Sequence, residues 1–360
     1  MKKRISTRAI CLLVAAVMLV GALTVSAING SPYENLKNAV IDALFYENFT
    51  MEGEFTLRVD GHIHSRAWTR HYYGDESRLE TSGNESHRLP GDTRPAHSTE
   101  NTNYHTRYFR INPVFTGGYG IQWYTVNWPW HNPNSALPQS TFPQSIGYEM
   151  FGQAGRSSNY LRLAELVVDL FVGDLKNNLT MNSQGDGITR ISGAITESQL
   201  PEFVRIIIDI AIDEQLRWRD TQTLQREDFV DVMDIPMRSI TIDRVQGHAD
   251  IDENGNLLNI NVLGTATTET IFGDTHVIEI EGTMNFTDIG TTMPESPFAG
   301  ANEIFHEHFN MLRERQMSNR QLFFTLDENG NINVDSITDQ WPRWTHQESH
   351  DLIYRYNRGL

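Results

Sequence analysis

Cysteine is almost absent from the sequence. The 360-residue chain has one, Cys11, which lies in an apolar segment near the N-terminus. If that segment is cleaved, the rest of the chain can form neither a disulfide nor a thiolate metal site. Lysine is scarce as well, so arginine supplies most of the positive charge. An excess of arginine over lysine marks no site by itself.

Positive charge is outnumbered by negative charge. The chain has 29 lysine and arginine residues against 46 aspartate and glutamate residues, a formal net charge of −17 at pH 7. A surface of this sign repels nucleic acid and anionic lipid headgroups. The acidic residues form no contiguous block, which indicates a soluble surface rather than a directed field. We therefore predict no nucleic-acid partner.

Catalytic signatures are also missing. The sequence has no Gly-x-Ser-x-Gly elbow, and residues 117–120 lack the spacing and the following helix of a phosphate loop. Residues 306–308 and 346–350 depart from the His-Glu-x-x-His pattern that metalloproteases require. We accordingly predict a protein that is not an enzyme, with no catalytic residue and no cofactor.

Some histidines have spacings that suit a metal ion. His62 and His64 would share one face of a strand, with His71 further along, and His346 and His350 would share one face of a helix. No third ligand follows at a motif spacing, so a solvated strand face is the favoured interpretation of the first pair. A metal-binding protein or hydrolase is the least favoured alternative.

Residues 250–255 resemble the first half of a calcium loop. Oxygen-bearing side chains alternate from Asp250, and Gly255 occupies the sixth position. The twelfth position is Asn261, where such a loop needs a bidentate glutamate. Asn-Gly between alternating segments is a strong hairpin signal. We predict plain hairpin turns here and in the similar segment 327–330.

The N-terminal segment predicts export. Four cations precede the uncharged, mostly apolar run 9–27, which ends in small residues that suit signal peptidase. Residues 1–27 are therefore a signal peptide or a signal anchor, and the body of the protein is extracytoplasmic. Cys11 precedes most of the apolar run, which argues against a lipoprotein anchor.

The body begins with a capped helix at residues 31–44 and continues with a hairpin of alternating strands from Phe49, turning at Asp60-Gly61. Residues 75–103 are polar and predict an exposed loop. Strand patterns return at 104–111 and 121–128.

Two apolar helices and a meander follow. The helices span 161–175 and 201–218, with a strand at 188–195 between them. Three long alternating segments then occupy 237–252, 257–271 and 275–288. The predicted fold is α+β: a long curved antiparallel sheet, half-barrel-like, that wraps the two mostly buried helices in a domain at 31–290. Residues 291–360 form an extension with a helix at 301–316, a hairpin around Asn329-Gly330 and an amphipathic piece at 340–357.

The stretches 172–179, 192–202 and 286–292 carry a resemblance. They are similar to an uncharacterised family of exported proteins from Gram-positive bacteria. The architecture that this resemblance implies is similar to the LolA-like lipoprotein-carrier half-barrels, whose curved sheet cups helices and can hold a lipid chain. It implies no site residues, and fold alone does not define function.

Together these features predict an exported binding module for a lipid or other apolar ligand. The alternative is a membrane-tethered envelope sensor that binds a protein partner. Candidates for a ligand cavity between helices and sheet are Trp123, Trp128, Val167, Leu170, Phe171, Phe203 and Ile207. For the tryptophans, ordinary sheet packing is the favoured interpretation, because aromatic strand residues more often have that role.

Overall fold

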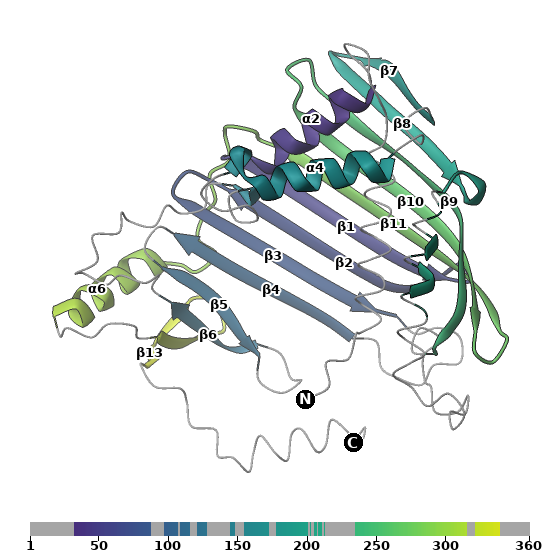
Figure 1. The fold of residues 1–360 in the computed structure, drawn as a ribbon. Helices are drawn as coiled ribbons and strands as arrows, with labels where there is room; N and C mark the ends of the chain where they lie inside the picture. Colours follow the sequence, from purple (N-terminus) through teal and green to yellow (C-terminus); the bar gives the residue numbers. More distant parts are fainter. Residues whose placement is uncertain are drawn as a thin grey trace.

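The protein is built on one open antiparallel sheet of thirteen strands (Figure 1). The structure is a computed structural model. It describes residues 32–87, 97–106, 109–115, 121–127, 145–147, 155–172, 178–200, 202, 205–206, 208–210, 212, 235–314 and 321–338. The strand order across the sheet is β13-β12-β6-β5-β4-β3-β2-β1-β11-β10-β9-β8-β7.

The named helices and strands have the following bounds. The helices are α2 (Pro32–Leu44), α4 (Asn159–Val172) and α6 (Ala301–Glu314). The first six strands are β1 (Phe49–Val59), β2 (His62–Tyr73), β3 (Ser77–Ser86), β4 (His97–Thr106), β5 (Arg110–Phe115) and β6 (Ile121–Asn127). The others are β7 (Leu179–Gly185), β8 (Ile188–Thr196), β9 (Met237–Ile251), β10 (Leu257–Thr270), β11 (Thr275–Thr287), β12 (Gln321–Leu326) and β13 (Ile332–Thr338).

The centre of the sheet follows the alternation of the sequence. The three long segments expected between 237 and 288 are β9, β10 and β11, and the expected strand at 188–195 is β8. Asp60 and Gly61 turn the β1–β2 hairpin with φ angles of 51° and 79°. This left-handed conformation suits glycine and aspartate in a two-residue turn. The prediction of a sheet-dominated antiparallel fold is confirmed.

The expected exposed loop at 75–103 is wrong. Strand β3 and most of β4 occupy it, and the two strands pair from Ser77↔Thr106 to Ser86↔His97. Both strands consist largely of serine, threonine, asparagine and glutamate, so they lack the apolar alternation that identifies a half-buried strand. On its other side β3 pairs with β2 along most of its length, and β4 pairs with β5 at Tyr104↔Ile111 and His105↔Arg110.

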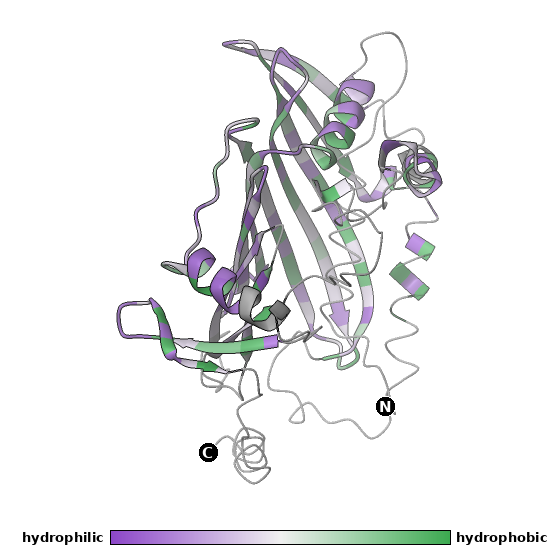
Figure 2. Ribbon diagram, turned by 90° about the vertical axis from the view of Figure 1, so that its left-hand side faces the viewer, coloured by the Kyte–Doolittle hydropathy of each residue, from purple (hydrophilic) through white to green (hydrophobic). Residues whose placement is uncertain are grey.

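The two faces of the sheet carry different cores. We call the face covered by α2 the inner face and the face covered by α6 the outer face; Figure 2 shows the two helices on opposite sides. On the inner face, Leu36 and Ala39 of α2 pack against Phe49 and its neighbours. On the outer face, Phe305 of α6 packs against strand residues of β4, β5, β6 and β12.

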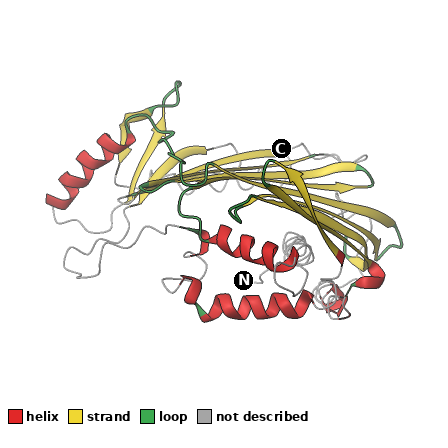
Figure 3. Ribbon diagram, turned by 90° about the horizontal axis from the view of Figure 1, so that it is seen from above, coloured by secondary structure: helices red, strands yellow, loops and turns green. Residues whose placement is uncertain are grey.

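The two predicted helices are less buried than the sequence indicated. Figure 3 shows α4 beside α2 on one side of the twisted sheet. In α4, Leu161 is buried, but Leu163 and Leu166 are 58% and 60% exposed. In the second segment the described residues between 202 and 212 are helical. Ile208 and Ile212 are buried there on the inner face. Each helix therefore has an apolar outward face as well as a core contact.

The segment 291–360 is part of the same sheet over its described length. Strand β12 pairs with β6, and β13 pairs with β12. The expected boundary at 290/291 therefore does not separate two sheets. Residues 1–27 and 340–357 lie outside the described part of the chain. Among the helices that the structure describes, none is long and apolar enough to cross a membrane.

Candidate functional site

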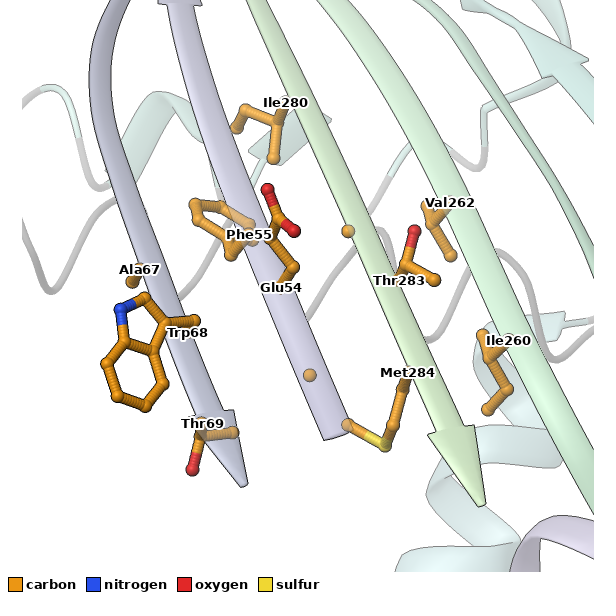
Figure 4. Close-up of a pocket in the computed structure, with 12 residues that line it drawn as sticks. Glu54, Phe55, Ala67, Trp68, Thr69, Ile260, Val262, Ile280, Thr283 and Met284 are labelled. Atoms are coloured by element: carbon orange, nitrogen blue, oxygen red, sulfur yellow. The ribbon is translucent and has the colours of Figure 1, made fainter. Parts of the chain in front are cut away.

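The inner face contains an apolar hollow of about 270 Å³ at the centre of the sheet (Figure 4). It lies over β2, β1, β11 and β10, which are neighbours in the sheet. The described residues that line it all belong to strands: Gly53, Glu54, Phe55, Ala67, Trp68, Thr69, Ile260, Val262, Ile280, Gly282, Thr283 and Met284. The side chains of these residues are mostly apolar.

The hollow centres on Gly282, which lies in one row of paired residues. Residues that pair in antiparallel register point to the same face, so one row crosses the sheet perpendicular to the strands. In the rows on either side, bulky residues such as Met284 and Ile280 rise from the sheet. The row between them runs Gly193, Gly247, Val262, Gly282, Phe55 and Ala67.

The glycines in this row differ in how much space surrounds them. A Cβ atom on Gly282 would meet only Phe55, at an ordinary 3.7 Å. On Gly247 it would lie 2.6 Å from the backbone oxygen of Asn261. Gly247 is thus required for close backbone packing, whereas Gly282 leaves open space. The missing side chain at Gly282 is the direct cause of the gap.

The hollow borders a buried polar cluster through Thr69. The Thr69 hydroxyl lies 2.6 Å from Nε2 of His71. His71 Nδ1 lies 3.6 Å from Glu80 Oε1, and His105 Nε2 lies 3.8 Å from Glu80 Oε2. Both distances are longer than a hydrogen bond. Each contact becomes an ion pair when the imidazole ring is protonated. Arg78 forms a salt bridge with Glu80 and stacks over Tyr73, with Cζ 4.0 Å from the ring centre.

Glu80 is the electrostatic centre of this cluster. Burial opposes its ionisation, but His105, His71 and the guanidinium of Arg78 outweigh burial and hold the pKa of Glu80 well below its usual value. The Arg78 side chain is 7% exposed, so its charge has little access to water. A buried cation of this kind requires a paired anion. Glu80 and Arg78 are therefore both ionised, and their opposite charges cancel.

Of the predicted cavity residues, Trp123 is the one whose side chain the structure describes. Trp123 lies on β6, four strands away from β2 and outside the hollow. Val167, Leu170 and Phe171 belong to α4, but their side chains lie outside the described part of the structure. The remaining three candidates, Trp128, Phe203 and Ile207, are outside the described residues altogether. The lining comes instead from strands, and glycines within alternating strands were the signal that could have located it.

The histidine candidates that the structure describes, on β2, do not form a metal site. The β1–β2 register shifts between Leu57 and Arg58, which pair with Ser65 and Ile63. This bulge leaves His64 between them, so the alternation that would place it with His62 on one face is interrupted. His346 and His350 lie outside the described residues. Within the described ranges, no three His, Cys, Asp or Glu side chains are grouped to hold a metal ion.

The expected hairpin at Asn254-Gly255 is confirmed. Asp252 accepts hydrogen bonds from the backbone N–H groups of Asn254 and Asn256 at 2.9 and 2.7 Å, and from the Asn256 amide at 2.8 Å. Its carboxylate oxygens are therefore occupied within the turn. The similar turn at 327–331 repeats these contacts around Asp327.

Comparisons with known proteins add little to this geometry. The sequence matches no protein-family model and no curated protein. One solved structure that it resembles is the N-terminal beta-barrel domain of Pseudomonas aeruginosa OprF, at 8% identity and a TM-score of 0.14, covering 67% of this chain and 98% of the other. A porin-like protein from Bacteroides uniformis aligns at 7% identity and a TM-score of 0.18, covering 67% and 96%. Similarity at this level assigns the chain neither a fold family nor a function.

Proposed function

We propose that the protein is a non-enzymatic binding protein that holds the apolar part of a ligand in the hollow of the inner face. The observation that carries this proposal is the open space at Gly282, which lies between the bulky residues Ile280 and Met284 on the same strand. Tight packing is the rule in protein interiors, and a gap beside well-packed cores is a place for a guest.

The size of the hollow favours one apolar tail. Ligand pockets for whole small molecules span roughly 300 to 1,000 Å³, and the hollow of about 270 Å³ lies just below that range. A lipid chain fits this description better than a rigid ring system. Buried apolar surface stabilises such a complex by roughly 25 cal/mol for each Å² removed from water.

The location that we propose is extracytoplasmic. Its support is the N-terminal sequence, with four cations before the apolar run 9–27. Cleavage after Ala27 would release a soluble binder, and an uncleaved segment would tether it to the membrane. N-terminal sequencing of the exported form distinguishes the two. An N-terminus at Ile28 would rule out the tethered form, including the tethered envelope sensor.

A pair of valine substitutions tests the hollow directly. Gly282→Val places a side chain into the gap, and its Cβ atom would meet only Phe55, at an ordinary contact distance. Thr265→Val introduces the same residue on the outer face of neighbouring β10, paired with Glu279. We expect a fluorescent acyl probe to bind wild type and Thr265→Val equally and Gly282→Val at least about tenfold more weakly. Equal binding to all three, or absence of any co-purified or added lipid in native mass spectrometry, would count against the proposal.

A further inference from the structure

At one edge of the hollow, the side chains of the inner face change from apolar to polar. Ala67 and Thr69 line the hollow on β2, and on the next strand they pair with Asn84 and Ser82. Register carries the same rows to β4, where they reach Thr99 and Asn101. We call Ser82, Asn84, Thr99 and Asn101 the amide–hydroxyl strip. Adjacent strands lie about 4.8 Å apart, so β3 lies about 5 Å and β4 about 10 Å beyond β2 at the edge of the hollow.

The strip carries hydroxyl and amide groups but no formal charge. On the described part of β3, Glu80 lies two residues from Ser82 on the same face, and Arg78 neutralises it through their salt bridge. The chain as a whole carries a net charge of −17. An anionic headgroup on the strip would therefore lose hydration and meet no unpaired cation in return, which is unfavourable in a partly buried site.

One atom of the strip is poised to bind a hydrogen-bond donor. Among the described residues, Oδ1 of Asn101 is buried and has no hydrogen-bond partner. Beside it, the hydroxyl of Thr99 donates to Oδ1 of Asn84 at 2.9 Å. A buried carbonyl oxygen without a donor is costly, and a hydroxyl group from a ligand would satisfy it.

The geometry points to an uncharged amphipathic ligand, with a single acyl tail in the hollow and a hydroxyl-bearing headgroup on the amide–hydroxyl strip. This inference rests on the proposed function, since it names the class of ligand that the same hollow takes. A monoacylglycerol has this chemistry. A free fatty acid has the same tail but carries a carboxylate where the strip offers no cation.

Three amphiphiles with identical tails test the inference on the full-length exported protein. They are a monoacylglycerol, the corresponding fatty acid and the corresponding alkyltrimethylammonium, each titrated against a bound fluorescent acyl probe. We expect the monoacylglycerol to displace the probe at concentrations about tenfold lower than the fatty acid, the difference that one satisfied buried hydrogen bond makes. Equal displacement by all three, or tighter binding of either charged amphiphile, overturns the inference and leaves the proposed function standing.

A substitution in the strip separates headgroup recognition from tail binding. Asn101→Ala should remove the preference for monoacylglycerol while probe binding stays unchanged. The control is Thr102→Ala, which changes the next residue of β4 on the outer face, opposite Thr81. A preference that persists in Asn101→Ala contradicts the inference. If none of the amphiphiles binds the wild type and the probe does not bind either, the proposed function itself fails.

Discussion

The hydroxyl of Thr69 lies 2.6 Å from Nε2 of His71, and it connects the apolar hollow to the buried cluster around Glu80. Thr69 thus belongs to both features: its side chain lines the hollow, and its oxygen contacts the polar group behind it. Thr69 therefore couples the polar cluster to the shape of the hollow. Substitutions in the cluster test how much it stabilises this part of the sheet.

Glu80→Gln should destabilise the protein by about 3 kcal/mol at neutral pH, because it leaves the buried Arg78 cation without its anion. The pKa of Glu80 is lowered from its ordinary 4.5 in the folded state. Its ionisation therefore stabilises the fold above that pH, and the stabilisation is lost as the pH falls below it. Urea unfolding at pH 7 and at acidic pH measures both effects.

Glu85→Gln is the matched control for this experiment. Glu85 lies on the same strand, but its side chain is 42% exposed and forms a salt bridge with His87. Exposed pairs contribute at most about 1 kcal/mol. A Glu80→Gln variant as stable as Glu85→Gln would show that Arg78 is stabilised by Tyr73 or by water rather than by Glu80.

Tyr46→Phe should lower stability by about 1 kcal/mol at neutral pH, because the Tyr46 hydroxyl accepts a 2.8 Å hydrogen bond from the buried Leu257 N–H. Burial is the main cause that raises the pKa of Tyr46 to about 12 from 10.0. The folded state thus binds the phenol proton more tightly, so this contribution is complete below pH 10 and is lost as the pH rises toward 12.

Urea unfolding at several alkaline pH values measures the difference between Tyr46→Phe and wild type. That difference should shrink as the pH rises from 10 toward 12. A difference that stays constant across this range would show that Tyr46 ionises equally in both states.

The effect of Gly83→Ala on stability should reverse its sign when Trp68 is replaced. A Cβ atom on Gly83 would lie 2.5 Å from Cε2 of Trp68, too close without a shift of the indole. We expect Gly83→Ala to cost about 1 kcal/mol in wild type. In a Trp68→Ala background it should instead stabilise by roughly 0.5 kcal/mol, because glycine loses more backbone freedom on folding. A double-mutant cycle by urea unfolding measures this coupling, and additive effects would contradict the contact.

The sequence predicted the strands that bury one apolar face, because their side chains alternate between apolar and polar. Strands β9, β10 and β11 alternate because their inner face is apolar, and that period is visible without any tertiary contact. Strands β3 and β4 were missed because the inner face turns polar there, and no apolar period remains. The hollow was missed for a different reason. Gly247 and Gly282 are 35 positions apart in the sequence, and only the pairing of each with Val262 brings them into one row.

Asp252 and Asp327 close two turns of the same kind. Substitution of Asp252 separates the contribution of its hydrogen bonds to stability from that of its charge. In both, Oδ1 accepts from the backbone N–H groups two and four residues later. Burial raises the pKa of Asp252, but hydrogen bonds from Asn256 and Asn254 outweigh it and lower the pKa below 3.8. For Asp327 the hydrogen bond from the Asn331 N–H is the main cause of a lowered pKa.

Asp252→Ala should destabilise the β9–β10 hairpin by about 1 kcal/mol, allowing for partial exposure of the carboxylate. Asp252→Asn keeps the acceptor oxygen and should restore most of that loss. The stability of the wild type relative to Asp252→Asn should then fall as the pH drops below 3.8, since the contribution of Asp252 depends on its ionised form. Because the carboxylate is already saturated by the turn, calcium should leave the thermal midpoint of the wild type unchanged. A rise in that midpoint with calcium, absent in Asp252→Asn, would instead assign this turn to a cation.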